Sequence, residues 1–447
     1  MPRRIIQSVF VFTLLLIYFT VGFAIAQQEE QPEIDLTQPL TLEQCIQLMQ
    51  QNSTDMRNAR INLAIADLRV KDARSRYYPN VSLTGRYNFS DRIDFGFEEQ
   101  NYDAGLNARY TLWDNGLREA NLAQSKEGQS ITVSRNEQIK QNLIFQVTQA
   151  YYDVLETQEL VKVGEDILDR SQENTARTQA FVEAGILIEA DVATAQVREA
   201  TDEQSLLNDQ NAFVIARATL PQLMGLDPGT LILVAPDTDY ERYLETGKID
   251  TIAITVEEAI QRAFENRPEF KEMQSRINQL EWGLTLEKLD RWPRLNAEYN
   301  YDVALAHYLR ERKNFKNFRS WDVTATLSFP LFDGGATKRR VAEAELVLEQ
   351  TRGDASELER SVALEVRQAY LNLKRAEKAV AISNTQVRNA QVSLEVIRGR
   401  FEQELAILLE LLDAQTGLAQ ALTNQVRAFY DYKITQTALR RAMGELQ

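Results

Sequence analysis

Residues able to carry out catalysis are scarce in this chain of 447 residues. It has one cysteine, Cys45, and one histidine, His307. A lone cysteine excludes an internal disulfide and a cysteine-based metal site. A nucleophilic enzyme needs a base beside its nucleophile, and the single histidine gives little support for one. The composition therefore predicts no enzymatic activity, no cofactor and no metal site.

A glycine-rich stretch, FDGGATK, has the glycine pair, threonine and lysine of a loop that could wrap a phosphate. A phosphate-binding loop of this kind requires G-x-x-x-x-G-K-[ST], which is absent here. The motif also occurs earlier in the chain as WDNGLRE. Each copy combines an aromatic suited to a membrane interface, an aspartate suited to helix capping and glycine for a turn. We interpret both as strand-to-helix collars, made by Trp113, Asp114, Gly116, Phe332, Asp333, Gly334 and Gly335.

Most of the chain consists of two segments with similar sequences. TLEQCIQLMQQN, beginning at Thr41, returns as TVEEAIQRAFEN at Thr255, and LMG at 223–225 returns as AMG at 442–444. Such long internal similarity predicts two structural repeats. We place the first repeat at 41–225, an inter-repeat linker at 226–254, and the second repeat at 255–447.

The N-terminus resembles an export signal. Arg3 and Arg4 precede an apolar run from Val9 to Ala26 that ends in Ala-Ile-Ala. A positive flank, an apolar stretch and small residues at its end predict a secretory signal peptide over 1–26, followed by an N-terminal linker at 27–40. A retained membrane anchor is the alternative. The net charge of −15 argues against nucleic acid as a partner.

Each repeat contains two segments in which apolar and polar residues alternate. They are NVSLTGRYNFS, DAGLNARYTLW, the run from Leu295 to Val303, and the run from Trp321 to Leu331. Their length and outward aromatics fit tilted strands that cross an outer membrane, although a soluble sheet with one wet face is the alternative. Four strands cannot close a barrel, and open edges in lipid are costly. We therefore expect three chains to share twelve strands.

The remaining residues favour helices. Long proline-free segments run from Leu117 to Ala184 and from Lys338 to Gln403, and the second has a heptad seam that includes Val366, Leu373 and Val380. Shorter helices are predicted at about Thr41–Tyr77, Leu187–Leu220, Val256–Arg291 and Ile407–Met443. The fold class is thus a mixed α/β membrane protein with two repeats, each of two transmembrane strands and long coiled-coil helices.

Taken in order, these motifs resemble the TolC-type outer-membrane efflux proteins over almost the whole mature chain. The resemblance implies a homotrimer in which a 12-stranded β-barrel continues into an α-helical barrel. It also implies an exit duct in the outer membrane with a long periplasmic extension. The partners implied are a periplasmic adaptor protein, an inner-membrane pump of RND or ABC type, and outer-membrane lipid.

The resemblance also implies roles for residues at the helical tips. By the family pattern, Gly185 marks the first tip and Asp191 follows it, whereas Glu404 stands where the second tip usually has glycine. These three residues are expected to contact the adaptor. A basic residue that pairs with the first tip's aspartate in some members is replaced here by Ala406, so closure is expected to rest on other contacts.

Two acidic residues follow the second tip. Glu410 and Asp413 are three residues apart and share one helix face. The resemblance implies that they narrow the periplasmic entrance, where three chains would contribute six carboxylates that attract cations. The alternative is a solvated acidic face. At the level of the whole chain, a periplasmic coiled-coil tether is the alternative to a channel, and the sequence does not indicate the cargo.

Overall fold

The computed structural model describes residues 36–92, 97–308, 316–403 and 405–446. The chain divides into two compact units, Met1–Gln38 and Pro39–Gln447. All helices and strands described below belong to the second unit. The predicted signal peptide and most of the predicted N-terminal linker lie outside the described residues.

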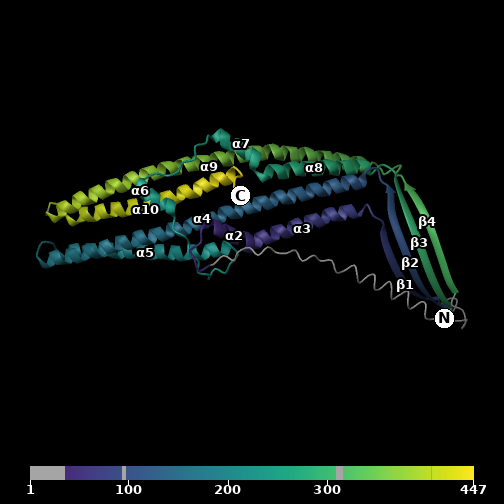
Figure 1. Cartoon of the computed structure of the whole chain (residues 1–447), viewed down its shortest axis with the longest axis horizontal. Coiled ribbons are helices and arrows are strands. Elements are labelled where there is room, and N and C mark those ends of the chain that lie inside the picture. Colours follow the sequence, from purple (N-terminus) through teal and green to yellow (C-terminus); the bar gives the residue numbers. More distant parts are fainter. Residues whose placement is uncertain (1–35, 93–96, 309–315, 404, 447) are drawn as a thin grey trace. The chain divides into compact units, whose positions relative to one another are not determined.

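Both halves of the chain contain the same order of elements (Figure 1). In the first half these are α2 (Leu42–Asn52), α3 (Thr54–Ser75), β1 (Asn80–Arg92), β2 (Phe97–Trp113), α4 (Leu117–Glu183) and α5 (Glu189–Leu223). A short helix, α6 (Thr238–Thr246), lies between the halves. In the second half they are α7 (Val256–Asn266), α8 (Pro268–Leu289), β3 (Arg294–Tyr308), β4 (Lys316–Ser328), α9 (Ala336–Glu402) and α10 (Leu408–Ala442).

The two longest helices, α4 and α9, have 67 residues each. At ~1.5 Å per residue each reaches about 100 Å. Figure 1 shows α5 lying along α4 and α10 lying along α9. The heptad seam predicted for α9 is confirmed, because Val366, Leu373 and Ala376 are fully buried. Among the described residues, no helix combines the length and the apolar character needed to span a bilayer.

The first helix of each half is broken, whereas the sequence predicted continuous helices at Thr41–Tyr77 and Val256–Arg291. Ser53 separates α2 from α3 with an extended ψ of 131°, and Arg267 separates α7 from α8 with a ψ of 127°. In the second half the cause is Pro268, since proline disfavours helical geometry in the residue before it. A capping box, Thr41 with Gln44 and Thr255 with Glu258, begins the helix that precedes each break.

The closing glycine of each half lies against one of these breaks. Gly225 has a φ of +77°, and a Cβ built on it would lie 2.5 Å from the backbone oxygen of Asn52. Gly444 has a φ of +74°, and its Cβ would lie 2.9 Å from the backbone nitrogen of Arg267. The LMG and AMG motifs therefore join the end of each half to its beginning.

The four strands form one antiparallel sheet in the order β1-β2-β3-β4. The two halves meet in the middle of the sheet, where β2 pairs with β3. Within the chain, β1 and β4 each pair on one side only. The sequence predicted that the last strand reaches Leu331, but β4 ends at Ser328 because Pro330 has no N–H to give to a ladder.

Candidate functional site

In the half of the sheet nearest the helices, the register places polar residues opposite polar residues and apolar residues opposite apolar ones. Across β2 and β3, Asn107 pairs with Asn300 and Arg109 with Glu298. Side chains that pair directly lie on the same face of a sheet. One face, which we call the polar face, therefore carries these residues, together with Asn80, Ser82, Thr84, Thr111, Asn296, Asp322, Thr324 and Thr326.

Hydrogen bonds connect the polar face across the strands. The Asn107 amide donates to the carbonyl oxygen of Asn300 at 2.6 Å, and Thr111 donates to Asn296 at 2.9 Å. Arg109 donates to Glu298 at 3.2 Å. Because these groups bond mainly to one another and remain partly open, the face suits contact with water.

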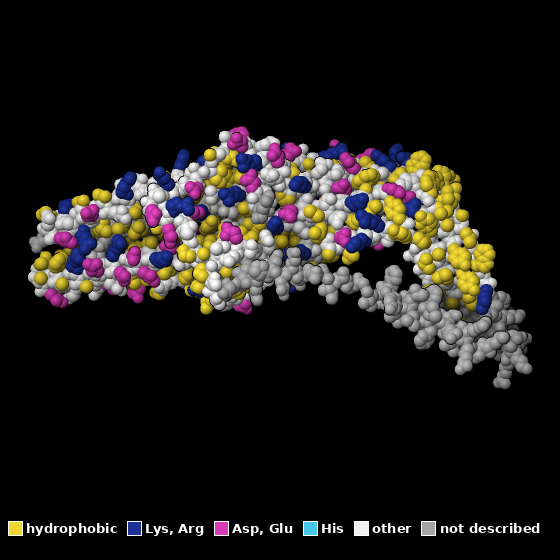
Figure 2. Space-filling model, in the orientation of Figure 1, with side chains coloured by type: hydrophobic (Ala, Val, Ile, Leu, Met, Phe, Trp, Pro, Cys, Tyr) yellow, Lys and Arg dark blue, Asp and Glu magenta, His cyan; other side chains and the backbone are white. Residues whose placement is uncertain are grey.

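The opposite face, which we call the apolar face, is exposed although it consists of large hydrophobic side chains. Leu83 is 79% exposed, Trp321 69%, and Val323 and Leu327 66% each. Figure 2 shows hydrophobic side chains gathered over the strands, whereas charged residues are interspersed over the helices. An apolar surface this extensive requires a nonaqueous partner, and together with the polar face it matches the wall of a membrane barrel.

The first predicted collar is held by Asp114. Its carboxylate accepts the backbone N–H of Gly116 at 3.3 Å and that of Arg118 at 3.2 Å, and it forms a 2.9 Å ion pair with the Arg118 guanidinium. Gly116 has a φ of +90°, and Asn115 donates to the carbonyl of Pro293 at 2.6 Å. Asp114 is buried. Its ion pair with Arg118 and the hydrogen bond from Asn115 to Pro293 together hold this collar in place.

In the second collar the aspartate again accepts the backbone N–H groups two and four residues later, but the residue four positions later is Thr337 and not an arginine. Asp333 accepts the N–H of Gly335 at 2.9 Å and that of Thr337 at 2.7 Å. Hydrogen bonds from the side chain and backbone of Thr337 lower the pKa of Asp333 to about 2. Gly334 and Gly335 both have positive φ. The collar aromatics are open to their surroundings, with Trp113 48% and Phe332 91% exposed.

The first helical tip turns at Gly185, whose φ is +78°. Asp191 accepts the backbone N–H of Ile188 at 3.1 Å and so caps the start of α5. A small hydrophobic cluster closes the two tips against each other, with the Phe181 and Phe401 rings 6.0 Å apart. Glu404 lies outside the described residues. Ile186, Ile188, Leu405, Ile407 and Leu409 stay exposed around the tips.

The two predicted entrance residues both lie in the first turns of α10 and are exposed. In contrast, the two residues between them, Leu411 and Leu412, are buried in the tip cluster. Neither Glu410 nor Asp413 forms an ion pair within the described part of the chain. Both carboxylates are therefore open to the surroundings of the tips.

A partly buried carboxyl that no sequence motif indicated, that of Glu156 on α4, lies near Arg427 and Asp431 of α10. Burial raises the pKa of Glu156 to about 7, with Asp153 and Asp431 adding to the rise and Arg427 opposing it. Because the folded pKa lies above the ordinary value of 4.5, folding favours the protonated form. Stability from this group is complete at low pH and declines as pH rises to about 7.

We expect Glu156→Gln to stabilise the protein at pH 8 by about 2 kcal/mol per chain and to change little at pH 5. At pH 5 the folded protein already carries a neutral Glu156, which the glutamine imitates. Thermal unfolding midpoints of both proteins at the two pH values check this. An equal shift at both pH values would show that packing, and not ionisation, dominates at this position.

No cluster of three or more metal-binding side chains occurs among the described residues.

A model of the family described as outer membrane efflux protein matches residues 45–226 and 259–445. Protein CyaE of Bordetella pertussis is 24% identical over 424 residues, covering 93% of this chain and 86% of that protein. Outer membrane protein TolC of Vibrio cholerae is 25% identical over 395 residues, covering 84% of each.

Solved structures show the same fold. The outer-membrane channel OprN superposes on this chain with a TM-score of 0.75 at 19% identity, and the match covers 90% of each of the two chains. The outer membrane channel MtrE of Neisseria gonorrhoeae, in its open state, superposes with a TM-score of 0.75 at 17% identity, covering 91% of this chain and 89% of the other.

Proposed function

This chain belongs to the outer membrane efflux protein family, and we propose that three copies of it assemble into one exit duct that docks to a periplasmic adaptor and an RND or ABC pump. Family membership makes the protein an outer-membrane efflux or secretion channel and not an enzyme. The sequence-based resemblance and the absence of enzymatic activity are thereby confirmed. Channels of this kind work with adaptor and inner-membrane pump partners.

The observation that carries the assembly is the four-stranded sheet with one polar and one apolar face. Its outer strands β1 and β4 each leave one edge without a partner from the same chain. Unpaired backbone groups in lipid cost several kcal/mol each, and closed single-chain barrels begin at about eight strands. Three sheets of four strands satisfy both requirements, with the polar faces inside and the apolar faces toward lipid.

Native mass spectrometry of the detergent-solubilised mature protein tests this number. We expect a complex of three chains that persists at nanomolar concentration, because separating the subunits exposes six strand edges. A complex of two or four chains would contradict the shared twelve-stranded barrel. A monomer that remains folded in detergent would contradict the need for shared edges.

At the other end of the duct, we propose that Glu410 and Asp413 line the entrance and that Gly185, Asp191 and Glu404 form the tips that the adaptor contacts. Support comes from the exposed, unpaired carboxylates on α10 and from the capped turn at the first tip. Six carboxylates in one ring create a local negative potential that favours cations.

We expect the double variant Glu410→Gln/Asp413→Asn to lower cation-over-anion selectivity roughly fivefold at 0.1 M salt, with a smaller effect at 1 M where charges are screened within ~3 Å. Reversal potentials across a planar bilayer under a KCl gradient measure it. The matched control is Asp166→Asn/Asp169→Asn, an exposed pair on α4 with the same spacing. Equal selectivity in both double variants would assign Glu410 and Asp413 to an ordinary solvated surface.

A further inference from the structure

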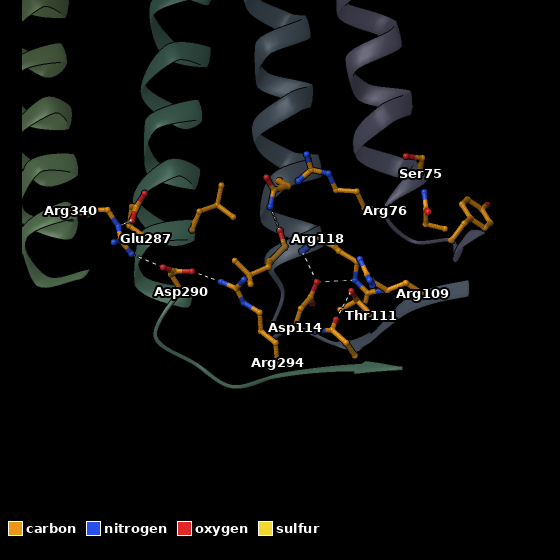
Figure 3. Close-up of a pocket in the computed structure, with 16 residues that line it drawn as sticks. Ser75, Arg76, Arg109, Thr111, Asp114, Arg118, Glu287, Asp290, Arg294 and Arg340 are labelled. Atoms are coloured by element: carbon orange, nitrogen blue, oxygen red, sulfur yellow. Dashed lines mark hydrogen bonds and ion pairs between the residues drawn. The ribbon is translucent and has the colours of Figure 1, made fainter. Parts of the chain in front are cut away.

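A cavity of about 740 Å³ lies where the strands begin and the helices end (Figure 3). Its walls come from the end of α3, the start of α4, the end of α8, the start of α9, and the strand residues nearest to them. Five arginines and three acidic residues line it, namely Arg76, Arg109, Arg118, Arg294, Arg340, Asp114, Glu287 and Asp290. The lining therefore carries more positive than negative groups, although the chain as a whole is acidic.

Two of these arginines, Arg294 and Arg340, share the carboxylate of Asp290. Arg340 forms ion pairs with Glu287 at 2.7 Å and with Asp290 at 2.5 Å. Asp290 also pairs with Arg294. One carboxylate thus serves two guanidinium groups, and this side of the cavity is balanced but leaves no surplus negative charge.

Arg118 is fixed on the other side. Its ion pair with Asp114 is largely buried, with side chains 14% and 8% exposed. Its guanidinium also lies 5.3 Å from the centre of the Tyr77 ring and 5.9 Å from that of Tyr110. A guanidinium held by a carboxylate and two aromatic rings is positioned and not free to leave. Arg118 therefore contributes to the shape of the cavity wall.

The surplus charge comes from Arg109 and Arg76. Arg109 makes one 3.2 Å contact with Glu298, and its side chain is 63% exposed. The Arg76 side chain is exposed and has no hydrogen bond or ion pair in the part of the chain that the structure describes. In Figure 3 the Arg76 side chain extends from the end of α3 toward α4. Nothing in the described part of the fold uses these two guanidinium groups fully.

We propose that this cavity binds an oxyanionic group, a phosphate or a carboxylate, of a solute inside the channel, with Arg76 and Arg109 as its principal ligands. The planar guanidinium fork matches two oxygens of such a group. The proposal rests on the proposed function, since that places the polar face toward the lumen. Asn80, Thr111 and Asn296 belong to both the polar face and the cavity wall, so the occupant comes from the lumen and not from lipid.

The test uses the full mature chain in a phosphatidylcholine planar bilayer, with inorganic pyrophosphate as the probe at constant ionic strength. We expect pyrophosphate to reduce the current in a saturable manner. In Arg76→Gln/Arg109→Gln the half-blocking concentration should rise at least about tenfold, because hydrogen bonds to charged groups are lost. Arg57→Gln, an exposed arginine earlier on α3 that does not line the cavity, should leave the block unchanged.

Conducting channels that pyrophosphate does not block, or that it blocks equally in the double variant, would overturn the proposal. If a preparation shows no current at all, the proposed function fails separately. Isothermal titration calorimetry of the detergent-solubilised protein with pyrophosphate then tests the binding site by itself. The site predicts a heat of binding in the unmodified protein that is absent in the double variant, and equal heats in both would contradict it. Replacing phosphatidylcholine by anionic phosphatidylglycerol separates the sources of phosphate, since competition by that lipid would contradict a solute site.

Discussion

Val323→Lys is expected to prevent the protein from inserting into a bilayer, whereas Thr324→Lys at the neighbouring position is expected to insert normally. Val323 lies on the apolar face, is 66% exposed and pairs with Tyr299. A lysine facing lipid near the middle of a strand costs about 2–4 kcal/mol. In a complex of three chains this becomes roughly 6–12 kcal/mol. Thr324 lies on the polar face opposite Glu298, where a lysine meets water and a carboxylate.

Flotation of reconstituted vesicles in a density gradient measures the fraction inserted. Val323→Ala serves as a second variant, because it removes the side chain without adding charge and should insert almost normally. If both lysine variants float equally, the assignment of the two faces is wrong. If Val323→Ala fails as completely as Val323→Lys, packing of the strand and not its lipid contact is responsible.

Gly225→Ala is expected to destabilise each chain by about 3 kcal/mol. Part of this cost is the left-handed backbone conformation at a φ of +77°. The larger part is steric, since the new Cβ would lie 2.5 Å from the Asn52 oxygen and 2.8 Å from the Ser53 nitrogen. These are backbone atoms at the α2–α3 break, and they move only if the break itself moves.

Gly185→Ala is the matched control because its φ is +78° but no atom lies within 4 Å of the position that a Cβ would take. It should cost about 1 kcal/mol, the backbone contribution alone. Thermal unfolding in detergent measures both variants. A Gly225→Ala protein no less stable than Gly185→Ala would mean that the closing glycine does not pack against the helix break.

Much of the fold could be predicted because its signals are periodic and local. Alternation identified the four strands, and the heptad positions in α9 were buried as expected. The bounds of α4 and α9 differ from the expected ones by at most two residues. The break at Ser53 was missed because serine is compatible with a helix, although Pro268 in the second half was a visible signal.

The collars show where the sequence was informative and where it was not. Both aspartates lie two residues before the N-cap glycines, Gly116 and Gly335, and each accepts a backbone N–H from the first turn of the helix that follows. Their surroundings differ because the residue four positions later is Arg118 in the first copy and Thr337 in the second. Asp114 is therefore buried in an ion pair, while Asp333 is exposed.

The arginine-lined cavity could not be found from the sequence. Arg76, Arg109 and Arg340 are far apart in the chain and come together only where two repeats and two kinds of element meet. No periodicity or motif connects them. Glu156 was missed for the same reason, since its neighbours Arg427 and Asp431 come from the second half of the chain.

The central claim is that three copies of this chain enclose one continuous aqueous path, and single-channel recording tests it most directly. Mature protein shown to be trimeric is added to a planar bilayer in KCl. We predict discrete, uniform current steps whose cation preference falls in Glu410→Gln/Asp413→Asn. Trimeric protein that inserts into the bilayer but never produces a current step would contradict the claim.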